Sequence, residues 1–241
     1  MPLRILHTND LHGKLSDKAE CALKQLRAEC DLYFDSGDAI RTGNVGVPLV
    51  QDHVWDALRR LRCSAGTCGN REFHVSEKVF RAKIKGCCHP LLVANLHWNG
   101  PVRSPLQPDW PESPLRKSIV LESVGVIGVM VPMVTNRMAA RHVSSFINSN
   151  PISAVAAEVE MLKPKCNTLI CISHLGLRRD VELAREVPQL NLILGGHSHD
   201  ALDKPVQVGN TFVCHAGSHG RFAGVYEFDG TLTRAELIQL H

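Results

Sequence analysis

Residues 3–13 read Leu3-Arg4-Ile5-Leu6-His7-Thr8-Asn9-Asp10-Leu11-His12-Gly13. A short apolar run such as the one that opens this stretch is typical of a buried strand, and the polar cluster that follows it contains Asp10 and His12. Because alternate side chains of an extended segment lie on the same side, both residues can reach one metal ion. Gly13 lets the backbone turn sharply beside them. This stretch predicts a strand that ends in a metal-binding turn.

Four further polar clusters follow predicted strands, in the order Asp35-Ser36-Gly37-Asp38, Gly69-Asn70-Arg71-Glu72, Ser173-His174-Leu175-Gly176 and Gly195-Gly196-His197-Ser198-His199-Asp200. In open α/β sheets, ligands bind at the carboxyl ends of strands. Carboxylate, imidazole and amide groups together suit divalent ions such as Mn²⁺, Fe²⁺ or Zn²⁺. Two ions about 3.5–4 Å apart, bridged by Asp38, would generate a hydroxide that attacks phosphorus in an in-line displacement. The five clusters therefore predict a two-metal centre.

Apolar runs alternate with helical patterns along the chain and predict an α/β fold. Strands are expected at residues 3–6, 32–34, 63–68, 91–94, 119–122, 124–131, 169–172 and 192–194, and helices at 17–29, 47–62, 75–84, 154–162 and 181–186. Residues 98–112 are rich in proline and polar residues, which predicts a loop. The tail alternates like antiparallel strands at 206–208, 211–215, 223–228 and 232–238. Two mixed sheets are expected, mainly parallel early and mainly antiparallel late.

The composition favours one globular domain over residues 1–241. Of these residues 44% are hydrophobic and 21% are charged, with a net charge of +3, so neither disorder nor nucleic-acid binding is expected. The first residues lack the long apolar stretch of a signal peptide, and the longest apolar runs, 124–134 and 190–194, are too short to span a bilayer. The nine cysteines are odd in number and imply no disulfide framework. We therefore expect a cytoplasmic protein with no membrane partner.

The order Asp-x-His, Gly-Asp, Gly-Asn, His and Gly-His-x-His resembles that of the calcineurin-like metallophosphoesterase superfamily. Residues 7–13, Gly69-Asn70-Arg71-Glu72-Phe73 and Gly196-His197-Ser198-His199 look like its 5′-nucleotidase branch, and the resemblance extends from Leu6 to about Gly224. It implies a four-layer α/β/β/α sandwich of two mixed sheets. It also implies that the first metal is held by Asp10, His12 and His199, the second by Asn70, His174 and His197, and that Asp38 bridges them.

The sequence departs from that branch at two places. Members commonly carry a further C-terminal domain that binds the nucleoside, and because this chain ends at His241 no such domain is expected. The family motif usually reads Gly-Asn-His-Glu, with an aspartate three residues beyond the histidine, but Arg71 and His74 stand at those two places. Arginine cannot act as a general acid near neutral pH, although it can bind phosphoryl oxygens bidentately. Either His74, one helical turn from Arg71, supplies the proton, or the enzyme favours good leaving groups such as diphosphates or activated diesters.

Three more residues are candidates for substrate contact beside Arg71. Asn44 lies in the loop that follows Asp38, where it can approach a phosphate group. His215 and His219 flank the end of a late predicted strand, from which either can approach the metals.

The predicted function is metal-dependent hydrolysis of phosphoric esters, with two divalent ions as cofactors. Mn²⁺ is expected first, with Zn²⁺ or Fe²⁺ as alternatives, because the same ligands accept several ions. Nucleotides are the first expected substrates, followed by phosphodiesters and nucleotide-sugar diphosphates. The rival hypothesis is a non-catalytic metal-binding scaffold of the same fold, which the replaced histidine favours and the complete ligand set opposes. The oligomeric state and the preference for monoesters or diesters stay open.

Overall fold

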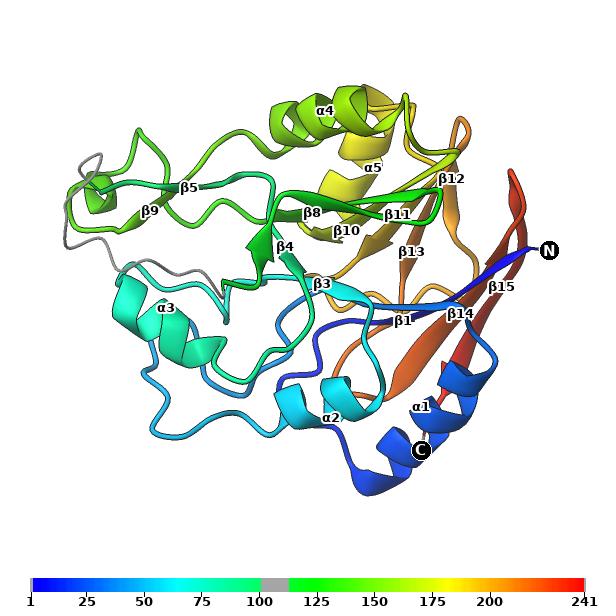
Figure 1. Cartoon of the computed structure of the whole chain (residues 1–241), viewed down its shortest axis with the longest axis horizontal. Coiled ribbons are helices and arrows are strands. Elements are labelled where there is room, and N and C mark those ends of the chain that lie inside the picture. The colour runs from blue at the N-terminus through cyan, green and yellow to red at the C-terminus, as the bar shows by residue number, and fades with distance from the viewer. Residues whose placement is uncertain (1, 101–112, 241) are drawn as a thin grey trace.

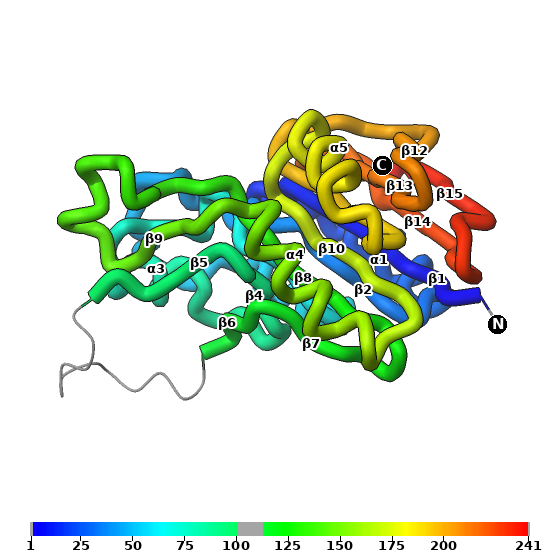
Figure 2. The backbone as a smooth tube through the Cα atoms, turned by 90° about the horizontal axis from the view of Figure 1, so that it is seen from above, coloured from blue at the N-terminus to red at the C-terminus, as the bar shows by residue number. Residues whose placement is uncertain are grey.

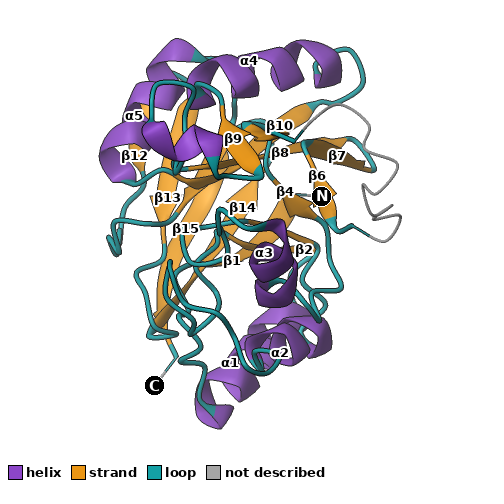
Figure 3. Cartoon of the chain, turned by 90° about the vertical axis from the view of Figure 1, so that its left-hand side faces the viewer, coloured by secondary structure: helices purple, strands orange, loops and turns teal. Residues whose placement is uncertain are grey.

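Two β-sheets face each other, and helices cover their outer faces (Figure 1 and Figure 3). The computed structural model describes residues 2–100 and 113–240. The first sheet has seven strands in the order β15 (Leu232–Gln239), β14 (Phe222–Phe228), β1 (Leu3–Thr8), β2 (Leu32–Asp35), β3 (Ala65–Thr67), β4 (Leu91–Leu92) and β6 (Leu115–Arg116). The second has six, in the order β12 (Val206–Val208), β13 (Thr211–His215), β11 (Leu192–Gly195), β10 (Thr168–His174), β8 (Val124–Met130) and β7 (Ser118–Leu121).

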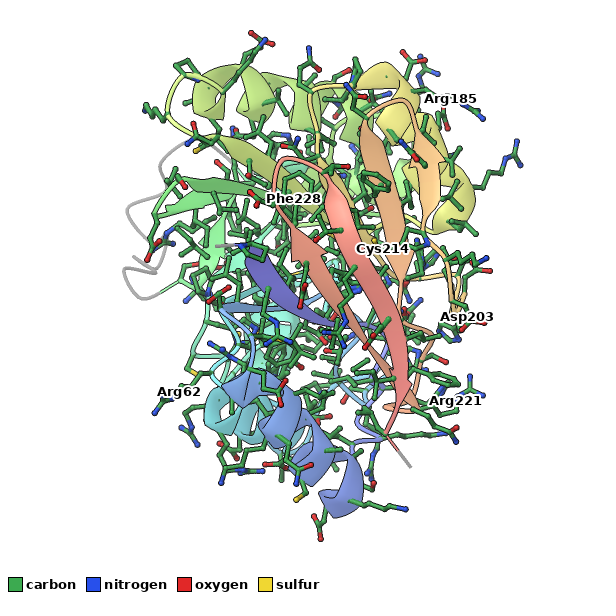
Figure 4. The ribbon with its side chains drawn as sticks, turned by 90° about the vertical axis from the view of Figure 1, so that its right-hand side faces the viewer. Arg62, Arg185, Asp203, Cys214, Arg221 and Phe228 are labelled. Carbon is green, nitrogen blue, oxygen red and sulfur yellow. The ribbon has the colours of Figure 1, made fainter. Side chains whose placement is uncertain are left out.

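Both sheets mix parallel and antiparallel pairs, as the sequence predicts. In the first sheet β1, β2, β3, β4 and β6 run parallel, while β14 pairs antiparallel with β1 and with β15. Figure 4 shows β15 and β14 on the face turned to the viewer, with β1 on the other side of β14. In the second sheet β8, β10, β11 and β13 run parallel, with β7 and β12 antiparallel at the edges. The parallel strands of each sheet, five in the first and four in the second, direct their carboxyl ends to one edge.

The helices form the two outer layers. The first sheet is covered by α1 (Asp17–Ala28), α2 (Val54–Arg60) and α3 (Glu77–Lys83), and the second by α4 (Pro151–Leu162) and α5 (Leu177–Glu186). The start of α1 is set by Ser16, whose side chain accepts a hydrogen bond from the amide of Ala19. Among the described helices, none combines the length and the apolar character needed to cross a bilayer.

The core follows from the period-two alternation of the strands. On β1, Ile5 packs into the core between the two sheets, whereas Leu6 packs under the helices of the first sheet. Phe34 and Tyr33 repeat this division on β2. The strands therefore bury both faces, and the fold is the four-layer sandwich expected from the sequence.

Several sequence boundaries were wrong. The helix predicted over 47–62 begins only at Val54, and the one predicted over 75–84 begins at Glu77. Thr211–His215 pairs antiparallel with β12, as expected, but its other edge pairs parallel with β11, which was not expected. Within the predicted loop 98–112, Trp98 ends a strand, and residues 101–112 lie outside the described residues.

A small third sheet was not predicted. It consists of β5 (Leu96–Trp98) and β9 (Phe146–Asn148), which pair antiparallel, and a short 3₁₀ helix, η1 (Ala139–His142), precedes β9. Figure 2 shows β5 and β9 extending beyond the two large sheets, on the same side as α3.

Candidate metal centre

The seven predicted metal ligands lie together where the carboxyl ends of the two sheets meet. The first sheet supplies Asp10 after β1, Asp38 after β2 and Asn70 after β3; the second supplies His174 at the end of β10 and both His197 and His199 after β11. His12 follows Asp10 in the same turn. Because β1, β2 and β3 are parallel neighbours, as are β10 and β11, their ends are adjacent without long connections.

Asp10, His12 and His199 form the first group. The Nε2 atoms of the two histidines lie 2.9 Å apart. Oδ1 of Asp10 lies 3.3 Å from Nε2 of His199 and 3.8 Å from Nε2 of His12. Ligand atoms from all three residues lie within 4.8 Å of one another, a spacing compatible with one bound cation.

The second group is centred on Asp38 and His174. Oδ1 of Asp38 lies 3.5 Å from Nε2 of His174, and ligand atoms of these two residues and Asp10 lie within 4.8 Å of one another. Oδ1 of Asn70 lies 3.3 Å from Nε2 of His174 and 2.9 Å from Nδ1 of His197. Asp38 also lies 3.9 Å from Nδ1 of His12 in the first group, so its carboxylate stands between the two groups.

The backbone at these ligands is in the left-handed region. Positive φ angles of 51° to 78° occur at Asp10, His12, Asp38, His197 and His199. Such angles are uncommon outside glycine and cost free energy unless surrounding contacts hold them. The clustering of this conformation at five of the seven ligands indicates that the turns are held in shape for their side chains.

Neighbouring groups orient the ligands. Nδ1 of His174 donates to the carbonyl of Ser36 at 2.6 Å, which leaves its Nε2 facing the second group. Oδ2 of Asp10 accepts from the side chain of Asn9 and from the amide of His197, both at 2.8 Å. These bonds fix which atom of each ligand faces a metal.

The ionisation states suit metal binding. Burial and the nearby guanidinium of Arg71 lower the pKa of His12 to about 3. Burial alone would raise the pKa of Asp10, but Nε2 of His199, 3.3 Å from Oδ1, and the charge of His174 bring that pKa down to about 2. Near neutral pH His12 is therefore a neutral imidazole and Asp10 a carboxylate, which are the forms that bind cations, whereas the interaction with Asp10 raises the pKa of His199.

One buried atom supports the fit to a metal. Among the described residues, Oδ1 of Asp10, which faces Nε2 of His12 and of His199, has no hydrogen-bond partner. Buried polar atoms without partners cost free energy. A divalent cation would supply the missing partner, and the mixture of carboxylate, imidazole and amide oxygen suits Mn²⁺, Fe²⁺ or Zn²⁺.

Arg71 and Asn44 lie at the second group. The backbone amide of Arg71 donates to Oδ1 of Asp38 at 2.7 Å. The side-chain Nε of Arg71 lies 3.8 Å from Oδ2 of Asp38. Oδ1 of Asn44 accepts from the side chain of Asn70 at 2.9 Å. Both predicted substrate contacts are therefore adjacent to proposed ligands.

His219 lies beside the first group. Its ring centroid is 4.8 Å from that of His12 and 5.5 Å from that of His199. Its amide donates to the carbonyl of Asp10 at 2.7 Å. This position agrees with the predicted approach to the metals, and a contact with substrate stays a prediction.

His215 has a different environment from the one expected. It is fully buried, and its Nε2 donates to Oδ2 of Asp180 at 2.8 Å. Asp180 also accepts from the hydroxyl of Ser173. Because β13 turns this side chain inward, His215 contacts α5 in place of the predicted substrate.

His74 does not share a helix with Arg71. Residues 70–72 form a turn and α3 begins only at Glu77, so the predicted common helical face is wrong. Nδ1 of His74 accepts a hydrogen bond from the amide of Ser76 at 3.0 Å, which gives this residue a local structural partner. Its role as a proton donor stays a prediction.

Sequence reasoning missed Glu72 as a structural component of the site. This fully buried carboxylate accepts from the amides of Asp38, at 2.9 Å, and Gly69, at 2.8 Å. It also accepts from the amide of Ile40 at 3.2 Å. The only indication in the sequence was its position beside Asn70 and Arg71. A sequence does not show which amides will donate hydrogen bonds to a carboxylate.

No protein-family model matches the chain. An apyrase from Anopheles gambiae is 32% identical over 234 residues, covering 83% of this chain and 39% of the apyrase. Human 5′-nucleotidase is 27% identical over 227 residues, covering 83% of this chain and 38% of the nucleotidase. The chain thus spans about two fifths of the length of these curated relatives.

A calcineurin-like phosphoesterase, YfkN from Bacillus subtilis, has the same fold. Its crystal structure superimposes with a TM-score of 0.74 at 16% identity, covering 99% of this chain and 91% of that one. The shared fold and the sequence relatives agree with the Asp and His groups at the strand ends. The chain therefore has the fold of a calcineurin-like phosphoesterase, and over most of its length its sequence is similar to those of an apyrase and a 5′-nucleotidase.

Proposed function

We propose that this chain is a dinuclear metal-dependent phosphoesterase. The observation that carries the proposal is the position of Asp38, whose two carboxylate oxygens lie near His12 of the first group and His174 of the second. A two-metal site needs a carboxylate that both ions share. The first ion would be held by Asp10, His12, His199 and Asp38, and the second by Asp38, Asn70, His174 and His197.

Two divalent ions bound by these residues would activate water and neutralise charge on the phosphoryl group. The protein's own contribution is to hold and orient the substrate. Arg71 presents a guanidinium beside Asp38, where it can bind phosphoryl oxygens and stabilise the charge that develops on them. Asn44, exposed and bonded to Asn70, is placed to donate to the same group.

Nucleotides are the first proposed substrates, because the sequence relatives include a 5′-nucleotidase and an apyrase. Arg71 supports a second candidate class. With arginine where the family motif has histidine, the chain lacks a general acid at this place, and a substrate whose leaving group needs no proton loses least. Nucleotide-sugar diphosphates and activated phosphodiesters are such substrates. Mn²⁺ stays the proposed native ion.

The test compares hydrolysis of bis(nitrophenyl) phosphate and nitrophenyl phosphate by metal-stripped protein, with and without added Mn²⁺. We expect Mn²⁺ to restore activity in the natural sequence and not in an Asp38→Asn variant. The ratio of diester to monoester activity then shows which class is preferred. Failure to hydrolyse either ester with two metals demonstrably bound would favour the non-catalytic scaffold.

A further inference from the structure

Lys83, the last residue of α3, is a buried lysine whose partners are backbone carbonyls. Only 1% of its surface is exposed. Its Nζ donates to the carbonyl oxygens of Gly43 at 2.9 Å, Asn44 at 2.8 Å, Arg71 at 2.7 Å and Phe73 at 3.2 Å. An ammonium group has three N–H donors, so these four acceptors use its full capacity. Lysine is seldom buried unless its charge is satisfied in this way.

The four carbonyls belong to two separate loops. Gly43 and Asn44 lie in the loop that follows Asp38, whereas Arg71 and Phe73 lie in the turn that follows Asn70. Carbonyls that point toward one another repel, and a cation between them removes the repulsion. Lys83 therefore joins the two loops at a fixed separation.

Both joined loops present side chains to the second metal group. Asn44 leaves one loop and meets Asn70, while Arg71 leaves the other and lies beside Asp38. The ammonium group of Lys83 thus binds the main-chain carbonyls of both Asn44 and Arg71, although it is not itself part of the metal centre. Movement of this group would move both side chains together.

Two bonds of Arg41 also hold the loop after Asp38, since its amide donates to Asp52 and its carbonyl accepts from Arg71, but the part beyond Asn44 packs little apolar surface. Its outer part exposes Val45, Val47, Leu49 and Val50, with 59% to 97% of each residue's surface accessible. These apolar residues bury little area that could fix the loop. Lys83 is itself fixed, because Nε1 of Trp55 in α2 donates to its carbonyl at 3.0 Å. Lys83, which binds the loop, is therefore itself bonded to the packed helix α2.

We propose that Lys83 is a positioning residue for phosphoryl binding, which acts by holding Asn44 and Arg71 in register over the second metal group. The proposal rests on the proposed function, in which Arg71 and Asn44 bind the phosphoryl group. If Lys83 only stabilised the fold, the effects of changing Lys83 and Arg71 on kcat/KM would be independent. A positioning role predicts that the two effects depend on each other.

The first experiment needs no activity. Amide hydrogen exchange is compared between the natural sequence, Lys83→Met and the matched control Lys78→Met, which changes an exposed lysine of the same helix. We expect faster exchange in both 41–46 and 69–74 in Lys83→Met, with the β-strands unchanged and Lys78→Met like the natural sequence. Unchanged exchange in either segment would overturn the proposal. If Lys83→Met does not fold, Lys83→Gln, whose amide can donate to two carbonyls, takes its place.

The second experiment measures coupling to Arg71. We expect Lys83→Met to lower kcat/KM for bis(nitrophenyl) phosphate about 10- to 100-fold, because small displacements of binding groups cost this much. In Lys83→Met/Arg71→Gln the loss should be clearly smaller than the product of the two single losses, because Lys83 acts in part through Arg71. Losses that multiply would overturn the proposal.

If the natural sequence hydrolyses neither ester, affinity for inorganic phosphate replaces kcat/KM in the same comparison. Calorimetry on the metal-loaded protein gives this affinity without turnover. This measurement tests the role of Lys83 even if the protein proves not to be a phosphoesterase. Equal phosphate affinity in Lys83→Met and Lys78→Met would reject the role.

Discussion

The polar atoms of the candidate metal centre are held by the surrounding backbone. Oδ1 of Asp10 is buried without a partner in the described part of the chain, and five ligands keep a left-handed backbone. Each of these features costs stability in the absence of metal. Side chains held in this way need little rearrangement to bind an ion, which is the benefit of a preorganised site.

His74 provides a residue-scale test of leaving-group chemistry. Since its Nδ1 is bonded to the amide of Ser76, we expect His74→Ala to lower kcat/KM for a nitrophenyl ester and for an alkyl phosphate by the same factor. A proton donor would matter far more for the alkyl phosphate, by about 10²-fold or more. Steady-state kinetics on the two esters measures the difference. A loss confined to the alkyl phosphate would restore His74 as the proton donor.

His89 provides a test of pH dependence away from the metals. It is buried, and burial lowers its pKa to about 4. Below the ordinary pKa of histidine the unfolded chain gains a proton that the folded chain does not, so stability falls as the pH drops from about 6.5 toward 4. Between pH 7 and pH 5 this costs about 2 kcal/mol. We expect urea unfolding of His89→Leu to lack this part of the loss.

The natural sequence should keep an acid sensitivity from other buried histidines, such as His7, whose pKa burial lowers to about 3. The quantity to compare is therefore the difference between the two proteins at each pH. A difference that stays constant from pH 7 to pH 5 would show that His89 does not titrate in this way.

At the scale of elements, the turn after β3 passes very close to the turn after β2. A methyl group added at Gly69 would lie 2.5 Å from the amide nitrogen of Asp38 and 2.7 Å from Nε2 of His174, and closer still to Oδ1 of Asp38. Only glycine fits between these two ligands. The close approach lets Glu72 bind the amides of both turns.

We expect Gly69→Ala to lower kcat/KM at least about 10²-fold, because the added methyl group displaces Asp38 or His174. Overpacking should also cost about 1–3 kcal/mol of stability. Gly230→Ala is the control, since that glycine has a positive φ but open space around it in the β14–β15 turn. It should lose about 1 kcal/mol from backbone strain and keep full activity. Normal activity in Gly69→Ala would contradict the close contact.

The same scale shows why some elements could be predicted and others could not. Asp10, Asp38 and His174 each lie within four residues of the end of an apolar run, so the sequence alone indicated that they lie at strand ends. The pairing of Leu96–Trp98 with Phe146–Asn148 joins segments about 50 residues apart, so the local sequence pattern of neither segment predicts it. The helix over 47–62 was extended too far because apolar spacing alone cannot show that Val47, Leu49 and Val50 stay exposed.

The partners of ionisable residues could not be predicted from the sequence either. Lysine is usually exposed, so nothing in the sequence indicated that the ammonium group of Lys83 would lie among four carbonyls. His215 was placed correctly at a strand end, but the face on which it would lie depends on the contact with Asp180. Residue type and spacing located the candidate metal centre, and tertiary contacts decided its supporting groups.

At the scale of the whole molecule, each sheet supplies part of the metal centre. Bound ions would therefore join the two sheets and stabilise the folded chain by mass action. We expect metal-stripped protein to melt at lower temperature than protein with excess Mn²⁺. The difference should correspond to about 2.7 kcal/mol when free metal is 100 times its dissociation constant. Calorimetric scans with chelator and with Mn²⁺ measure it.

Asp38→Asn is the matched comparison for this measurement, because it removes the carboxylate that stands between the two groups. Its melting temperature should respond to Mn²⁺ by clearly less than that of the natural sequence. Equal stabilisation of the two proteins would argue against Asp38 as a shared ligand.

The division of ligands between the two sheets is also a division along the chain. Asp10, His12, Asp38 and Asn70 all precede the end of β6 at Arg116, and His174, His197 and His199 all follow the start of β7 at Ser118. A chain cut at that junction gives two pieces, neither of which owns a complete ion-binding set. The β1–β14 pairing spans the cut and would draw the pieces together. Turnover of a chromogenic ester would then report fragment reunion, which makes this fold a natural starting point for a split-enzyme sensor.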